Sequence, residues 1–123
     1  MLFRSTLVKR ALEEIRNALA APELRVLINK DTRKLLRPLL EPLELAHVGD
    51  QWLLVERTWM DHFDRCEAQH HGPVTVRDLR RWIDQPRPKG LPVSLQNLII
   101  NTYELQSNRL LILQGIEIGR AHV

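Results

Sequence analysis

The sequence is poor in cysteine, in aromatic residues and in long apolar runs. It holds one cysteine among 123 residues, and aromatic residues make up 5% of the chain. A single cysteine, Cys66, excludes an internal disulfide framework and suits a reducing compartment. No apolar run approaches the roughly 20 residues that a membrane helix needs, and the N-terminus lacks a signal-peptide pattern. We therefore expect a cytoplasmic protein with a core of Leu, Ile and Val and no contact with a membrane.

The common catalytic motifs are also absent. The five glycines form no G-x-x-x-x-G-K-[ST] motif, so no phosphate-binding loop is predicted. There is no G-x-S-x-G, no H-E-x-x-H and no carboxylate pair beside an obvious apolar pocket. We therefore predict no catalytic residue, no cofactor and no enzyme activity within this segment.

The net charge of +3 is unevenly spread along the chain. Residues 1–44 hold nine Lys and Arg against six Asp and Glu, residues 45–71 hold two against five, and residues 72–90 hold five against two. Strong nucleic-acid binders carry a sustained basic stripe, which this patchwork does not form. Mixed-sign faces exposed to water are the simplest interpretation.

The first half of the chain predicts two helices and a hairpin. Helical spacing of apolar residues over 5–20 indicates a helix that Ser5 or Thr6 caps and Pro22 stops. Its predicted buried face consists of Val8, Leu12, Ile15 and Leu19. Residues 24–28 fit either a strand or a helix continuation. Asp31 is predicted to cap a second helix, whose pattern Pro38 and Pro42 break. Gly49-Asp50 predicts a β-hairpin over 43–57, with Trp52, Leu54 and the run to Val55 burying one face.

The second half predicts three helices and a strand. The first helix covers 58–70, with Trp59, Phe63 and Cys66 on one face. The second begins at the cap Thr75 and buries Val76, Leu79, Trp82 and Ile83. A proline-stiffened loop leads to the cap Ser94 and a helix that buries Leu95, Leu98, Ile99, Thr102 and Leu105. Arg80 is expected to pair with Asp84, and "RLLILQG" is expected to form a strand.

The order of these elements predicts a mostly helical α+β fold. We expect an N-terminal helical part at 1–44 and a winged-helix-like part with a short β-hairpin at 45–117, sharing one core. Two half-winged units that share a core fit the same order.

The last six residues, 118–123, match a translation of a common sequencing adapter. We therefore expect them to be non-native, with the natural sequence of this fragment ending near Ile116 and continuing in a longer protein. A natural frayed terminus is the alternative.

Three side chains have the types and spacing of metal ligands. His62, Cys66 and His70 follow at i, i+4 and i+8, so they share one helix face within an arc of about 80°. Zinc accepts such nitrogen and sulfur ligands, but no second cysteine or C-x2-C pair completes a set. Cys66 also follows Trp59 and Phe63 on the apolar face, where a cysteine is usually core filling.

A helix-turn-helix that binds nucleic acid is a further candidate. The second helix, 94–107, would enter the major groove, yet it holds no Lys or Arg. Its outer amides could contact adenine, and the basic residues before it could contact phosphates. These candidates are Arg77, Arg80, Arg81, Arg87, Lys89, Gln96, Asn97 and Asn101.

Two stretches carry a family resemblance. They are "LLRPLLEPLELAHVGDQWLLVERTWMDHF" and "VTVRDLRRWIDQPRPKGLPVSLQNLIINTYELQSNR", with an R-x-W-I-D helix, a Pro-Gly loop and a V-x-x-L-Q-N-L-I-I helix. The chain thereby resembles, over most of 30–113, a region of the large anti-phage ATPases of the phage growth limitation and bacteriophage exclusion (BREX) systems.

The resemblance implies a longer parent that binds ATP and Mg²⁺ through a P-loop domain elsewhere and works beside a methyltransferase in antiviral defence. This region would be a noncatalytic interdomain or assembly module, whose partners are the rest of the parent chain and other subunits of the defence system. The alternative is a DNA-binding winged-helix module.

Overall fold

The computed structural model describes residues 2–107, 112–113 and 116–117, with side chains from Thr6 to Ser107. The chain divides into two compact units, Met1–Trp59 and Met60–Val123. Helices predominate and a small antiparallel sheet accompanies them, so the expected α+β, mostly helical class is confirmed. The hairpin lies in the first unit, although the sequence analysis grouped it with the later helices. The expected adapter translation, 118–123, lies outside the described residues.

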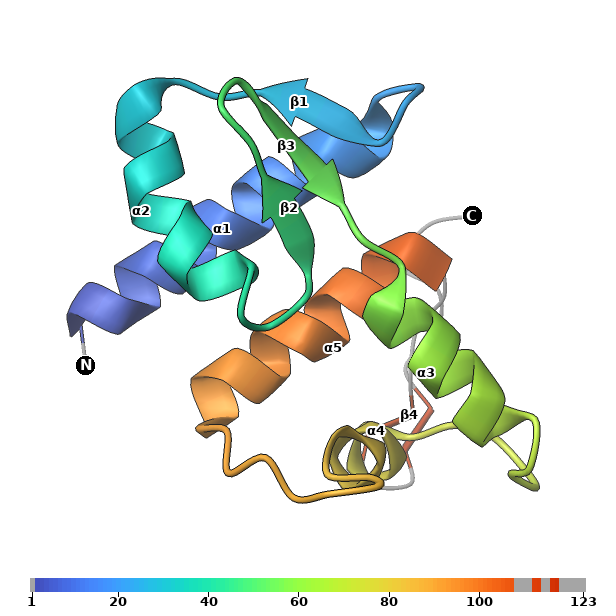
Figure 1. Ribbon diagram of the computed structural model, residues 1–123. Helices are drawn as coiled ribbons and strands as arrows, with labels where there is room; N and C mark the ends of the chain where they lie inside the picture. The colour runs from blue at the N-terminus through green and yellow to red at the C-terminus, as the bar shows by residue number, and fades with distance from the viewer. Residues whose placement is uncertain (1, 108–111, 114–115, 118–123) are drawn as a thin grey trace. The chain divides into compact units, whose positions relative to one another are not determined.

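The first unit is a three-stranded antiparallel sheet with two helices. Its sheet has the order β1-β3-β2, α1 packs against β1 and β3, and α2 packs against β2 and α1 (Figure 1). The ambiguous stretch 24–28 forms a strand, and the predicted hairpin is confirmed. The elements are α1 (Leu2–Ala20), β1 (Arg25–Leu27), α2 (Lys30–Leu40), β2 (Ala46–Val48) and β3 (Trp52–Val55).

The face that β3 buries is the opposite of the predicted one. Leu53 and Val55 are buried, whereas Trp52 and Leu54 are exposed. Successive side chains of a strand point to opposite sides, so a shift of one residue exchanges the two faces. Leu53 lies opposite Val48 in the register, and Val48 is also fully buried, which fixes the side that faces the core.

The helices of this unit also differ in detail from expectation. Ala11, Ile15 and Ala18 form the buried face of α1, because short alanine side chains let the helix lie close to the sheet. Asn29, not Asp31, caps α2: its Oδ1 accepts from the Thr32 backbone N–H at 2.7 Å. The helix includes Pro38, ends at Leu40 and stops before Pro42, and α1 begins at Leu2 rather than at Ser5 or Thr6.

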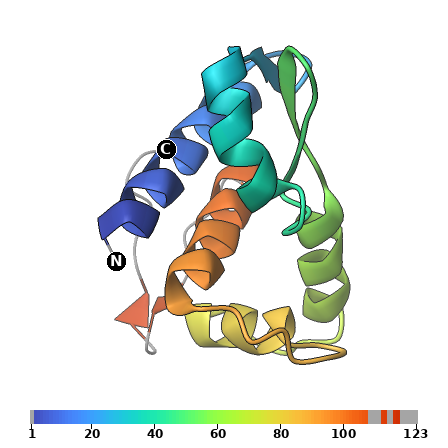
Figure 2. The same ribbon diagram turned by 60° about the vertical axis from the view of Figure 1, so that its left-hand side comes forward.

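The second unit is built from helices. Its elements are α3 (Thr58–Glu67), α4 (Val76–Ile83), α5 (Val93–Ser107) and a short pair, β4 (Ile112–Leu113) with β5 (Ile116–Glu117). α4 contacts α5, below whose N-terminal end it lies in Figure 2. Phe63 and Tyr103 are fully buried and pack edge to face, with ring centroids 4.9 Å apart. The remainder of the strand expected at 109–115 lies outside the described residues.

The caps of α4 and α5 had been expected at Thr75 and Ser94. Thr75 caps α4, as expected, and it also forms a capping box with Asp78. Ser94 lies inside α5, which begins one residue earlier, and the Pro92 carbonyl accepts from the backbone N–H groups of Leu95 and Gln96. A carbonyl that already accepts helical bonds defines the cap, so Pro92 occupies that position.

Within the ranges that the structure describes, no helix combines the length and the apolar character needed to cross a membrane.

Candidate functional site

Three of the predicted nucleic-acid residues of the second unit bond to one another. Arg80 donates from Nη1 to Gln96 Oε1 at 2.9 Å and from Nη2 to Asn97 Oδ1 at 2.7 Å, and so joins α4 to α5. It does not form the expected pair with Asp84, whose carboxylate accepts from the Lys89 backbone N–H at 3.0 Å. The amides that could read a base are therefore acceptors for a neighbouring guanidinium.

The other predicted cations of this region divide into two groups. Arg81 donates to Asp78 at 3.0 Å, and the Lys89 ammonium donates to the Ile83 carbonyl at 2.7 Å at the end of α4. Arg77 and Arg87 are exposed, and Asn101 is half-buried on α5. α5 also carries Glu104, whose pKa is raised by burial. The structure brings Arg80, Gln96 and Asn97 together, and it commits them to helix packing.

Asp78 is the centre of a polar cluster at the start of α4. Its carboxylate accepts from the Thr75 backbone N–H at 3.0 Å, from Arg81 at 3.0 Å and lies 3.3 Å from His70 Nε2. Burial acts to raise the pKa of Asp78, but the hydrogen bonds from Thr75 and the positive charges of His70 and Arg81 lower the pKa below its usual value. The ionised carboxylate thus fixes the entry to α4.

α3 ends at Glu67, so the helix face predicted to carry all three candidate metal ligands does not extend to His70, and the Nε2 atoms of both histidines are already engaged. His62 Nε2 lies 2.7 Å from the Trp82 carbonyl, and His70 Nε2 lies 3.2 Å from the Pro73 carbonyl. A carbonyl only accepts, so each of these nitrogens donates a proton and offers no lone pair. Cys66 Sγ lies 3.9 Å from His62 Nε2. No group of three or more His, Cys, Asp or Glu within the described chain is arranged to hold a metal ion.

The thiol of Cys66 is not activated. Burial raises the pKa of Cys66, and the positive charges of Arg65 and Arg81 offset only part of that rise. A nucleophilic cysteine needs a lowered pKa and an orienting base. The imidazole nitrogen beside the thiol, His62 Nε2, donates to a carbonyl and so does not serve as that base. The side chain fills a half-buried position on α3.

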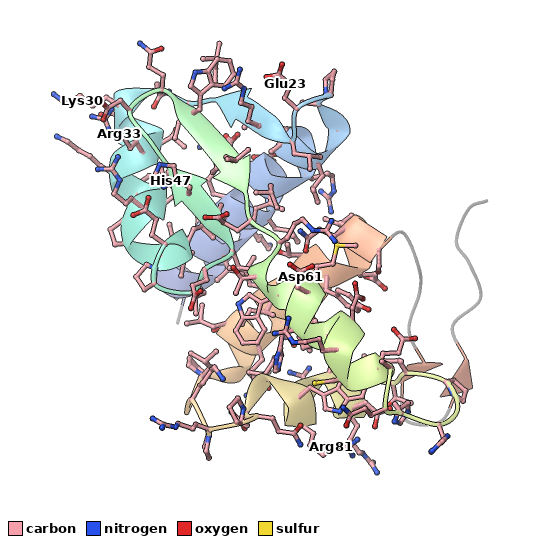
Figure 3. All side chains as sticks on the ribbon, turned by 45° about the vertical axis from the view of Figure 1, so that its right-hand side comes forward. Glu23, Lys30, Arg33, His47, Asp61 and Arg81 are labelled. Carbon is pink, nitrogen blue, oxygen red and sulfur yellow. The ribbon has the colours of Figure 1, made fainter. Side chains whose placement is uncertain are left out.

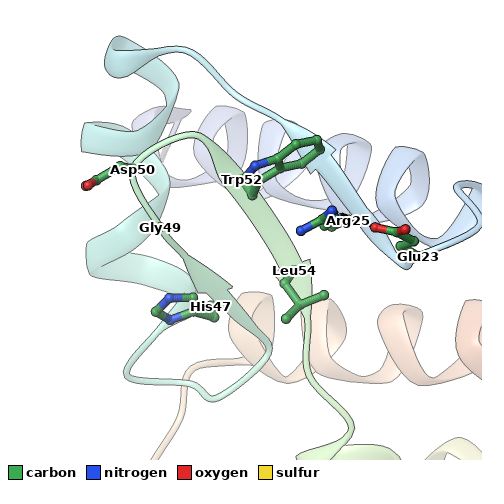
Figure 4. Close-up of a pocket in the computed structure, with 7 residues that line it drawn as sticks. All are labelled: Glu23, Arg25, His47, Gly49, Asp50, Trp52 and Leu54. Carbon is green, nitrogen blue, oxygen red and sulfur yellow. Dashed lines mark ion pairs between the residues drawn. The ribbon is translucent and has the colours of Figure 1, made fainter.

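Sequence reasoning missed the outer face of the sheet in the first unit. Leu27 is 62% exposed, Trp52 37% and Leu54 38%, and these three form the centre of that face. The guanidinium of Arg25 stacks on Trp52 at 4.2 Å from the ring centroid and pairs with Glu23 at 2.6 Å. Figure 4 shows Arg25 between Trp52 and Leu54 in a hollow of about 350 Å³. We call Leu27, Trp52, Leu54 and Arg25 the outer sheet face.

A second surface that the sequence analysis missed is a basic stripe on α2. Lys30, Arg33, Lys34 and Arg37 follow at i, i+3, i+4 and i+7, which places them on one side of the helix. Arg33 donates to the Asp50 carbonyl at 2.6 Å and Arg37 to the Val48 carbonyl at 2.8 Å, so both contact the hairpin. Lys30 and Arg33 are seen at the start of α2 in Figure 3. The helical spacing of these four residues in the sequence could have revealed this stripe.

The protein-family model described as BREX System ATPase PglY protein 5th domain matches residues 6–104. The match covers all five helices and the three-stranded sheet of the described chain except for the start of α1 and the end of α5. No solved structure matches the chain.

Proposed function

The chain belongs to the family of the fifth domain of the BREX system ATPase PglY protein, and we propose that it is a noncatalytic assembly module of a phage-defence ATPase. The observation that carries the proposal is the outer sheet face. Three large apolar side chains lie exposed together on one side of a sheet whose other side is covered by helices. Exposed apolar patches with a polar rim are typical of protein interaction sites.

The noncatalytic part of the proposal is supported by the chemistry of the side chains. The sequence has no phosphate-binding loop, so ATP and Mg²⁺ are assigned to another domain of the ATPase. Among the described side chains, every buried nitrogen or oxygen atom has a hydrogen-bond partner. A catalytic site would be expected to retain polar groups that are unsatisfied or strongly shifted in pKa.

The partner we propose for the outer sheet face is another domain of the same ATPase chain. A fifth domain implies neighbouring domains, and interdomain interfaces combine an apolar centre with charged groups at the rim. The rim here carries both signs, with Glu23 and Asp50 on one hand and Arg25 on the other. Such a rim suits a specific and partly polar contact.

The test replaces two residues of the outer sheet face in the complete ATPase. Trp52→Thr with Leu54→Thr is expected to loosen the docking of this domain and so to increase proteolysis at the domain boundaries several-fold. Leu35→Thr is the matched control, because Leu35 is 48% exposed but lies on α2. Equal proteolysis of the double variant and the wild type, with an intact fold by circular dichroism, would reject the proposal.

Contact with duplex DNA is a second candidate, and the basic stripe on α2 favours it. α2 precedes the hairpin in the order helix, strand, helix, hairpin, which is the arrangement of a winged helix with one helix fewer. Four cations on one helix face could contact phosphates on either side of a groove that admits a helix. The stripe is not purely basic, because Asp31 and the exposed Asp50 carboxylate lie beside it.

Fluorescence anisotropy with a labelled duplex at low and moderate salt tests this candidate. Lys30→Gln with Lys34→Gln is expected to weaken binding and to reduce the salt slope by about 2, one for each lost phosphate contact. Arg77→Gln with Arg87→Gln removes the same charge from α4 and its loop and is expected to leave binding unchanged. Salt-independent binding, or equal loss in both double variants, would reject contact through α2.

A further inference from the structure

The side chains between α3 and α4 form a hollow of about 530 Å³ with polar walls. Its size lies within the range of small-molecule sites. Its walls carry two guanidinium groups, two imidazoles and two amides, and none of the residues that line it is acidic: they include Arg65, Arg81, His62, His70, Gln69 and Gln85. We propose that this hollow binds a small oxyanion of the phosphate type.

Two positive charges meet at this hollow. Arg65 comes from α3 and Arg81 from α4, and both act electrostatically on the thiol of Cys66 between them. Arg81 uses one Nη2 bond at 3.0 Å to hold Asp78, and its side chain remains 53% exposed (Figure 3). A guanidinium offers five N–H donors, so a single bond leaves several for an anion. Charge-assisted bonds from two guanidiniums are the usual means of holding phosphate.

The acidic group nearest to the walls does not oppose an anion. The Asp78 carboxylate accepts from the Arg81 guanidinium and from the Thr75 N–H, and it lies 3.3 Å from His70 Nε2. It therefore holds Arg81 in place rather than repelling a ligand. The same cluster orients His70, whose ring packs edge-on against Trp82 at 5.4 Å.

The walls suit an anion better than the zinc ion that the spacing of His62, Cys66 and His70 predicts. Both imidazoles use Nε2 as a donor, and the Cys66 thiol is held in its neutral form. A dication would also face the charges of Arg65 and Arg81 without an unpaired carboxylate to balance them. His62, Cys66 and His70 line the same hollow, and the arginines beside them reverse the charge of the ligand that fits.

A titration of the whole chain with inorganic phosphate tests the proposal by NMR, with chloride at equal ionic strength as reference. Saturable shifts are expected in the amides of Cys66 and Gln85 and in the Nε–H signals of Arg65 and Arg81. Arg65→Gln is expected to weaken phosphate binding about tenfold or more, because it removes a charge-assisted pair. Arg77→Gln is the control, since Arg77 is exposed on α4 but does not line the hollow.

Three results would overturn the proposal. The first is a linear drift of signals with phosphate that never saturates, and the second is an equal loss in Arg65→Gln and Arg77→Gln. The third is stoichiometric zinc binding that Cys66→Ala abolishes, without any phosphate-dependent shift. Arg81→Gln gives an independent check, and its spectrum shows whether the loss of the Asp78 bond has disturbed α4. None of these results depends on the outer sheet face of the first unit.

Discussion

The two units differ in what their surface side chains contact. In the second unit, Arg80 bonds to two amides of the next helix, and Asp78 gathers Thr75, His70 and Arg81. In the first unit, Leu27, Trp52 and Leu54 lie exposed on the side of the sheet opposite to the buried Leu53 and Val55. Hydrogen bonds within a unit are explained by the folding of that unit, whereas a group of exposed apolar side chains is a candidate for contact with a partner. The comparison therefore directs the search for an interface to the first unit.

Among the polar side chains, the largest effect is expected in the polar cluster of the second unit. Asp78→Ala removes the capping box and the partner of Arg81, and it should lower the free energy of unfolding by about 2 kcal/mol. Thermal or urea unfolding of the two proteins at neutral pH gives the difference. Asp50→Ala, in the hairpin turn of the first unit, should change the free energy of unfolding by less than about 0.5 kcal/mol, since the Asp50 side chain is 95% exposed. Similar losses in both variants would remove the contrast between the units.

The effect of Asp78 should also depend on pH in a defined direction. Folding lowers the pKa of this carboxyl below its ordinary value of 3.8, so the ionised form stabilises the fold above that value. Its contribution is lost as the pH falls through the lower folded value. The stability difference between wild type and Asp78→Ala should therefore shrink below about pH 4. A difference that grows in acid would show that the bonds to Thr75 and Arg81 do not stabilise the charged form.

An intermediate effect is expected for the bond between the helices of the second unit. Arg80→Met keeps a long side chain but loses the hydrogen bonds to the two side-chain amides. It should lower the free energy of unfolding by about 1 kcal/mol. Arg77→Met, on the exposed side of the same helix, should cost less than about 0.5 kcal/mol. Urea unfolding measures both, and a double-mutant cycle with Asn97→Ala isolates the bond. If Arg80 and Arg77 behaved alike, Arg80 would again be a candidate for contact with a ligand.

The sequence predicts those features of this structure that depend on neighbouring residues better than those that depend on residues far apart in the chain. Gly49-Asp50 and Thr75 act locally, and both the hairpin and the cap of α4 were predicted from a few neighbouring residues. The buried side of β3 depends on its neighbours in the sheet, so the prediction that Trp52 and Leu54 face the core was wrong. Register with Val48 decides that question, and it is not visible in a strand of four residues.

The candidate sites follow the same rule. His62, Cys66 and His70 line one hollow although α3 ends before His70, and Arg65 and Arg81, which set its charge, come from two different helices. The bonds from Arg80 to Gln96 and Asn97 also cross between helices, across a loop whose path the sequence did not define. Which polar groups a protein uses internally is a property of packing. A motif identifies the groups but not their partners.

The smallest effect on stability is expected on the outer sheet face. An exposed and a buried leucine of the same sheet can be compared there. Leu27→Thr should change the free energy of unfolding by less than about 0.5 kcal/mol, because the side chain is 62% exposed and threonine favours strands. Leu53→Ala, in the adjacent strand, should cost about 2–5 kcal/mol, because Leu53 is fully buried. Urea unfolding of the two variants measures this ratio. If Leu27→Thr lowered the free energy of unfolding as much as Leu53→Ala, Leu27 would stabilise the fold of this chain. The proposal that Leu27 contacts another domain would then lose its support.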